Sequence, residues 1–85
     1  MQKAPTRAVF DVITDFLATS PSPETLLAYH FPDDLQKRAD YLIEKNGEGD
    51  LTIDEQKELD DFVQADEMMT LLKVKTKLRL KKDNP

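Results

Sequence analysis

The segment from Glu44 to Glu55 contains the residues whose types and spacing come nearest to a chemical site. Counted from Glu44, side chains with oxygen atoms stand at positions 1, 3, 5, 9 and 12, a glycine stands at position 6 and an apolar residue at position 8. A loop that wraps one calcium ion needs oxygen ligands at this spacing and a sharp turn at the glycine. The segment is therefore a candidate calcium-binding loop.

The same segment also has a structural interpretation, which we favour. An EF-hand loop begins with aspartate, whereas this one begins with the longer Glu44, and Glu48 at position 5 crowds a loop that must surround one ion. Thr52 and Glu55 fit a capping box at the start of a helix, and Gly49 permits the turn before it. We therefore expect a helix-loop-helix connection, assign no metal ligand and no cofactor, and keep an EF-hand-like module as the less favoured alternative.

The remaining polar residues do not make a catalytic set. The chain has no cysteine, its only histidine is His30, and both of its serines lie in the proline-rich segment 20–23. A Ser-His-Asp arrangement is not credible from these residues. The aspartate pairs at 33–34 and 60–61 fit a first helical turn and a solvated helix face better than a general acid and base. We therefore expect a protein that is not an enzyme.

Charge is distributed unevenly along the chain. Residues 1–72 contain sixteen acids and six bases, whereas residues 73–85 contain six bases and one acid. The net charge of −5 is therefore the difference between a strongly acidic body and a basic end. An acidic body repels nucleic acid and favours basic partners, while a basic end can attract phosphates.

Length and composition limit the class of protein. A chain of 85 residues fits a single domain, residues 1–85, with a modest core that a partner or a second copy could complete. The chain has no cysteine and thus no sign of an oxidising compartment. It also has no run of eighteen apolar residues, the length that would cross a bilayer. Asp11 and Asp15 interrupt the first apolar stretch, unlike in a signal peptide. We expect a cytoplasmic protein.

Two helices are predicted in the first third of the chain. Apolar residues recur at helical spacing over residues 6–18, with acidic residues between them. A proline-rich break follows, in which Ser22 is a good N-cap and Pro23 suits the first helical position. The second helix should therefore begin at Pro23 and run to about Tyr29.

Two further helices are predicted around the candidate loop. An apolar stripe favours a third helix over residues 33–45, which Asn46 and Gly47 should end because both tolerate the left-handed conformation. The capping box at Thr52 should start a long fourth helix that reaches at least Leu72.

The basic end of the chain, residues 73–85, is ambiguous in pattern. Apolar and polar residues alternate over residues 72–81, which is typical of a strand. We favour a helix, because no second alternating segment exists to pair with a strand and a lone strand is unstable in water. The predicted fold class is all-α, a small helical domain with a central helix-loop-helix hairpin and a long C-terminal helix.

Two groups of residues are candidate binding sites. The last helix is apolar over a wide face and also acidic, which favours a protein partner bound by Phe62, Asp66, Glu67, Met68, Met69 and Leu72. The alternative is a nucleic-acid-associated regulator that binds phosphates through Lys73, Lys75, Lys77, Arg79, Lys81 and Lys82. The basic group contains no aromatic residue that could stack on bases, which disfavours single-strand recognition.

Several segments also carry a family resemblance, namely residues 20–24, 35–38, 41–46, 51–55 and 58–60. With them the chain resembles a group of small helical bacterial proteins, common in cyanobacteria, that share the signature EKN..G.LT..E...LD and a basic C-terminal end. The match covers about residues 19–82. Such proteins are placed as antitoxins or accessory partners of nuclease-type toxins, so the resemblance implies an inhibitory, protein-binding role. It implies no catalytic residues.

Overall fold

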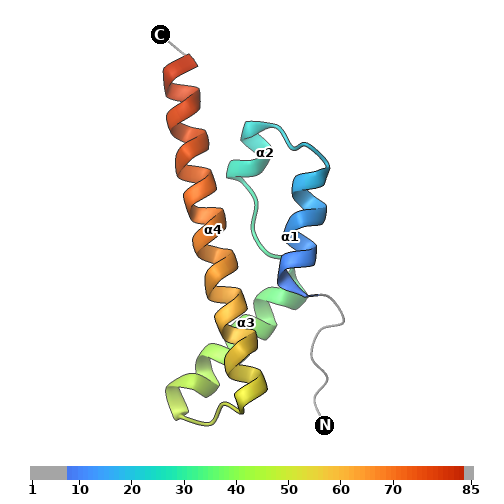
Figure 1. Ribbon diagram of the computed structural model, residues 1–85, viewed down its shortest axis with the longest axis vertical. Coiled ribbons are helices and arrows are strands. Elements are labelled where there is room, and N and C mark those ends of the chain that lie inside the picture. Colours follow the sequence, from blue (N-terminus) through green and yellow to red (C-terminus); the bar gives the residue numbers. More distant parts are fainter. Residues whose placement is uncertain (1–7, 84–85) are drawn as a thin grey trace.

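The computed structural model describes residues 8–83, and this part of the chain folds into helices without a strand (Figure 1). The helices are α1 (Val9–Ala18), α2 (Pro23–Leu27), α3 (Asp33–Glu48) and α4 (Ile53–Asp83). The predicted all-α class, the central helix-loop-helix and the long last helix are confirmed. The first helix, predicted from residue 6, begins instead at Val9, because Ala8 has an extended backbone and is its N-cap; residues 6 and 7 lie outside the described residues.

The start of α2 follows the local signals in the sequence. The Ser22 hydroxyl accepts a hydrogen bond from the backbone N–H of Thr25 at 3.2 Å, and Pro23 occupies the first helical position. The helix is two residues shorter than predicted. Its end tightens, because the backbone N–H of Tyr29 donates to the carbonyl of Leu26, only three residues back, at 3.2 Å.

The end of α3 differs from the prediction by three residues. Asn46 and Gly47 are helical, and the residue in the left-handed conformation is Gly49, with φ of 76°. The N–H of Gly49 bonds to the carbonyl of Asn46, and the N–H of Asp50 bonds to the carbonyl of Lys45. These bonds satisfy two of the carbonyls in the last turn of the helix, so the helix can continue to Glu48 before it turns.

The start of α4 is the predicted capping box. The backbone N–H of Thr52 donates to the Glu55 carboxylate at 3.0 Å, and the backbone N–H of Glu55 donates to the Thr52 hydroxyl at 3.1 Å. Two backbone donors that have no partner within the helix are thereby satisfied.

We expect Thr52→Ala to lower the free energy of unfolding by about 1 kcal/mol, because it removes the N-cap acceptor of α4. The measurement is urea denaturation followed by circular dichroism. The matched control is Thr70→Ala, the same change at an exposed position of the same helix, which should be neutral or slightly stabilising. Equal effects of the two substitutions would show that the cap is not a determinant of stability.

The basic end of the chain continues α4 as a helix. The favoured helical interpretation of residues 73–82 is therefore confirmed over the described part of that segment. Leucine, lysine and arginine are good helix formers, and the preceding helix supplies the nucleus, so the alternating pattern does not produce a strand.

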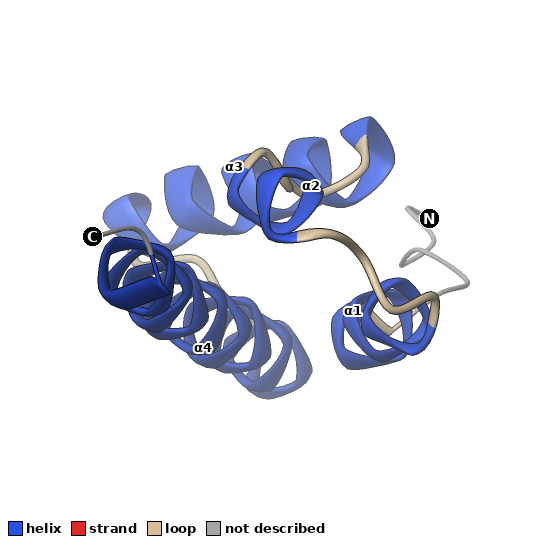
Figure 2. Cartoon of the chain, turned by 90° about the horizontal axis from the view of Figure 1, so that it is seen from above, coloured by secondary structure: helices blue, strands red, loops and turns tan. Residues whose placement is uncertain are grey.

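The core is a single apolar cluster to which every helix contributes. It joins α1, α2 and α3 to one side of α4, and Figure 2 shows these three helices above and to the right of α4 in the end-on view. Phe16 stacks on Tyr29 and Phe31 meets Phe62 edge to face, with ring centroids 4.2 and 6.0 Å apart. The buried residues are Val9, Ile13, Leu26, Leu35, Ala39, Leu42, Leu59, Phe62, Ala65 and Met69.

One ion pair fastens α3 to α4 beside this core. The Arg38 guanidinium donates to both carboxylate oxygens of Glu58, with Nε to Oε2 at 2.8 Å and the second nitrogen to Oε1 at 2.9 Å. Arg38 also lies over the ring of Tyr41. The hydrogen bonds to Glu58 raise the pKa of Arg38 above its usual value, and partial burial opposes that shift. The pair is geometrically well matched and only partly open to water.

Candidate functional site

The structure divides the six residues predicted to contact a protein partner. Phe62 and Met69 are only 5% and 4% exposed and belong to the core, and Leu72 is half-buried against it. Asp66, Glu67 and Met68 are exposed. The assignment of Phe62 and Met69 to a partner surface is therefore corrected, because a partner could reach them only if the core opened.

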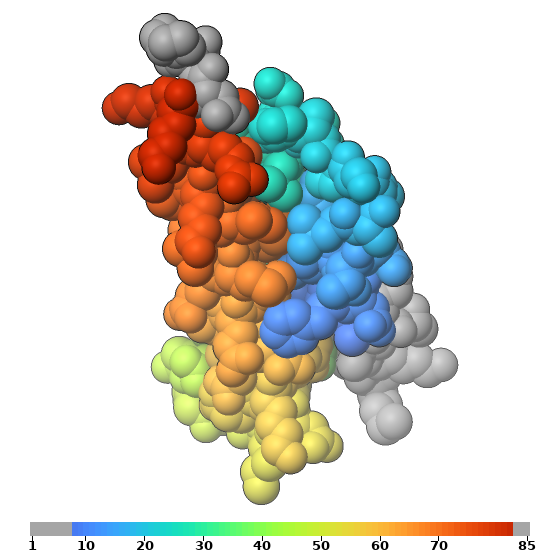
Figure 3. Space-filling view, turned by 45° about the horizontal axis from the view of Figure 1, so that its top comes forward, coloured from blue at the N-terminus to red at the C-terminus, as the bar shows by residue number. Residues whose placement is uncertain are grey.

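A different apolar surface lies on the side of α4 away from the core, and we name it the outer ridge. At about 3.6 residues per turn, Leu71, Val74 and Leu78 project from the side of the helix opposite to Phe62, Ala65 and Met69, and Val63 and Met68 flank them on either side. Their side chains are between 40% and 57% exposed. Figure 3 shows α4 along one edge of the molecule, with α3 beside its lower part. The outer ridge consists of Val63, Met68, Leu71, Val74 and Leu78.

Of these five residues, sequence reasoning placed only Met68 in the partner-binding set, although a signal for the others was present. Leu71, Val74 and Leu78 recur at intervals of three and four residues, which is the spacing of one helical face. The alternating pattern over residues 72–81 conceals that spacing. Once the segment is known to be helical, the face becomes evident.

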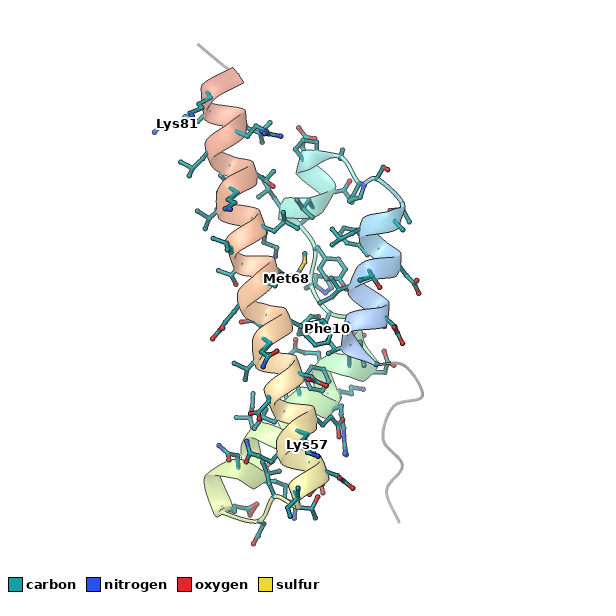
Figure 4. All side chains as sticks on the ribbon, viewed as in Figure 1. Phe10, Lys57, Met68 and Lys81 are labelled. Atoms are coloured by element: carbon teal, nitrogen blue, oxygen red, sulfur yellow. The ribbon has the colours of Figure 1, made fainter. Side chains whose placement is uncertain are left out.

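The predicted phosphate-binding residues do not lie on one face. Lys73 is turned toward the fold, since its Nζ donates to the backbone carbonyl of Tyr29 at 2.6 Å. Lys75 and Arg79 project to one side of the helix and Lys77 and Lys81 to another. Figure 4 shows Lys81 directed away from the molecule near the projecting end of α4. The basic end of α4 is thus charged around most of its circumference.

Most of the candidate calcium-binding segment, residues 44–55, is helical. Its first five positions, residues 44–48, are the last turn of α3, and its last three positions begin α4. Only residues 49–52 connect the two helices, and the Glu55 carboxylate is used in the capping box. Within residues 8–83 no group of three acidic or histidine side chains is placed to share a metal ion.

We expect calcium to leave the melting temperature unchanged, because ligation would require the last turn of α3 to unwind. Thermal melts with millimolar calcium and with a chelator should superimpose. A saturable rise in melting temperature that Glu55→Ala abolishes and Thr52→Ala preserves would instead show that the segment rearranges around the ion.

The ionisation of Glu55 makes the stabilising effect of the capping box depend on pH. The hydrogen bond from the backbone N–H of Thr52 lowers the pKa of Glu55 most strongly, and desolvation is the next largest effect and opposes it. The Thr52 side chain, Arg38 and Lys45 lower the pKa further by smaller amounts. A carboxyl whose pKa is lowered on folding stabilises the protein above its unfolded pKa, and that contribution is lost as the pH falls through the folded pKa.

We therefore expect the melting temperature of the native chain to fall more steeply below about pH 4.3, the ordinary glutamate pKa, than that of Glu55→Gln. The glutamine keeps a side-chain acceptor but cannot titrate. Paired thermal melts across this range measure the difference. Parallel curves would mean that Glu55 has the same pKa in the folded and unfolded chain.

The sole histidine is a surface residue. His30 is exposed, and its Nδ1 lies 3.1 Å from the backbone carbonyl of Phe31. This contact lies at the connection between α2 and α3, beside a surface pocket that Asp66 and Thr70 also line.

None of the helices in residues 8–83 combines the length and the apolar composition that a bilayer crossing requires. Comparison of the chain with family models, with curated proteins and with solved structures gave no match.

Proposed function

We propose that this protein is a non-catalytic protein-binding module whose binding surface is the outer ridge of α4. The observation that carries the proposal is a group of five large apolar side chains on α4, each at least 40% exposed, of which Leu71, Val74 and Leu78 face directly away from the core. Aligned apolar side chains on the surface of a small domain mark a site of interaction.

Of the two acidic residues predicted to assist binding, Glu67 retains a role in this proposal. Glu67 is exposed beside the outer ridge, whereas Asp66 lines a pocket with His30 and Lys73 on another side of α4. Charges at the rim of an interface steer a partner of opposite sign and raise the rate of association more than the final affinity. An antitoxin-like inhibitor or an adaptor, the role that the family resemblance implies, needs such a combination of apolar contact and acidic steering.

A photo-crosslinking experiment tests whether this surface binds protein. Leu71→benzoylphenylalanine places a reactive group at the centre of the outer ridge, and Ile43→benzoylphenylalanine places it on α3 at a position of similar exposure, 58% against 55%. In native cell extract we expect a protein adduct at position 71 that is absent at position 43. Equal labelling at both positions, or none at 71, would contradict the proposal.

The second candidate function is binding of nucleic acid through the basic end of α4. It is favoured by the exposure of Lys75, Lys77, Arg79, Lys81 and Lys82 in the projecting part of the helix. We expect affinity for duplex DNA no tighter than the non-specific range of about 10⁻⁴ to 10⁻⁶ M at physiological salt. Tight, salt-steep binding that is lost in a Lys75→Gln, Arg79→Gln, Lys82→Gln variant would reverse the order of the two candidates.

A further inference from the structure

The charge of α4 changes sign along its length, and the outer ridge spans the point of change. Residues 54–67 contain seven acids and one base, whereas residues 73–82 contain six bases and no acid. The ridge runs from Val63 in the acidic half to Leu78 in the basic half. On the outer side of α4, the exposed acids Asp60 and Glu67 lie toward one end and the exposed bases Lys75 and Lys82 toward the other, with Leu71 between them.

We infer that the outer ridge binds a second copy of this chain, with the two α4 helices antiparallel and crossing at Leu71. This inference rests on the proposed function, because it names the partner of the same surface. In an antiparallel pair the acidic half of each helix faces the basic half of the other. A parallel pair would instead set acid against acid and base against base, which is destabilising.

The register follows from the positions of the exposed residues. With the two-fold axis at Leu71, residues equally distant from position 71 in opposite directions face one another. Met68 then meets Val74 of the second copy, which closes an apolar centre around the two leucines. Outside that centre the facing charges are opposite in sign, Glu67 with Lys75 and Asp60 with Lys82. All of these side chains are exposed in the single chain.

The shape of the fold leaves room for this arrangement. α1, α2 and α3 all contact α4 from the side of the core, and in the end-on view of Figure 2 the opposite side of α4 is bare. The contact from residue 60 to residue 82 would extend over about 33 Å of helix. One pair of helices buries less than a standard interface of about 1,600 Å², so the dimer should dissociate on dilution.

Sedimentation equilibrium of the purified full chain measures this association. We expect a concentration-dependent dimer, and Leu71→Glu should raise its dissociation constant roughly tenfold or more, because the two introduced carboxylates face each other across the axis. The matched control Ile43→Glu introduces the same charge at an exposed residue of α3 and should leave the constant unchanged. A chain that stays monomeric at millimolar concentration, or a dimer insensitive to Leu71→Glu, overturns the inference.

Charge exchange and cross-linking test the antiparallel register. Glu67→Lys and Lys75→Glu should each weaken the dimer, and the double variant should restore it, since both facing pairs are then opposite in sign again. Because the natural chain has no cysteine, Leu71→Cys can be oxidised alone and should form a disulfide dimer much faster than Ile43→Cys. Failure of the double variant to restore the dimer, or equal rates for the two cysteines, overturns the register.

The outcome separates this inference from the proposed function. A monomeric purified chain that still gives a protein adduct at position 71 in extract means that the ridge binds a different protein, so only the inference fails. The mass of the adduct then distinguishes a second copy from another polypeptide. Absence of both the dimer and the adduct removes the proposed function as well.

Discussion

Leu42→Ala should lower the free energy of unfolding by about 2–5 kcal/mol, the largest effect expected from a single substitution in this chain. Leu42 lies on α3 with none of its surface exposed, between helices that share one small core. Its truncation removes buried apolar surface and leaves a cavity that three short helices and one long one can close only in part. Urea denaturation monitored by circular dichroism measures the loss.

The neighbouring residue provides the control for this substitution. Ile43 is 58% exposed, so Ile43→Ala should change stability by no more than about 0.5 kcal/mol. The two substitutions remove similar aliphatic groups from adjacent positions of one helix. Similar losses at both would contradict the orientation of α3, because they would place residue 43 in the core.

Removal of one partner of the Arg38–Glu58 pair should lower the free energy of unfolding by about 1.5–3 kcal/mol, the usual contribution of hydrogen bonds to a charged group. Glu58→Met leaves the guanidinium of Arg38 without its acceptor, although that side chain is only 10% exposed. The double variant Arg38→Met, Glu58→Met should recover most of the loss, because an apolar pair needs no hydrogen bonds.

A double-mutant cycle from chemical denaturation measures this recovery. Lys57→Met, at the exposed residue beside Glu58, is the control for helix propensity and should be near neutral. If the double variant were as unstable as the sum of the two single variants, the two side chains would be energetically independent, and the ion pair would not contribute to the docking of α3.

The signals that predicted the fold correctly were local ones. Ser22 before Pro23 and Thr52 before Glu55 specify helix starts through hydrogen bonds that span three residues, so they can be recognised without knowledge of the rest of the fold. The end of α3 was harder to place, because Asn46, Gly47 and Gly49 all tolerate a left-handed conformation. The choice of Gly49 depends on the hydrogen bonds that the turn makes afterwards.

The candidate site could not be predicted in the same way. Helix α4 has apolar residues on both of its sides, with Phe62 next to Val63 and Met69 next to Met68. Which side of α4 is buried depends on where α1 and α3 pack against it. These contacts come from segments distant in sequence, so the sequence of α4 alone does not reveal them. The Arg38–Glu58 pair, twenty positions apart, has no sequence signal for the same reason.

The projection of α4 beyond the other helices implies that its local stability is not uniform (Figure 1). Near Phe62 and Met69, opening the backbone would expose the core and therefore requires most of the free energy of global unfolding. Beyond Leu78, where side chains such as Arg79 and Lys82 are exposed, helical hydrogen bonds can open with little loss of packing. Amide protons should accordingly exchange with solvent progressively faster toward the C-terminal end of α4. A ligand that covers this end would slow that exchange. Its net binding free energy would be reduced by the free energy needed to order a helix terminus that packs weakly against the rest of the fold.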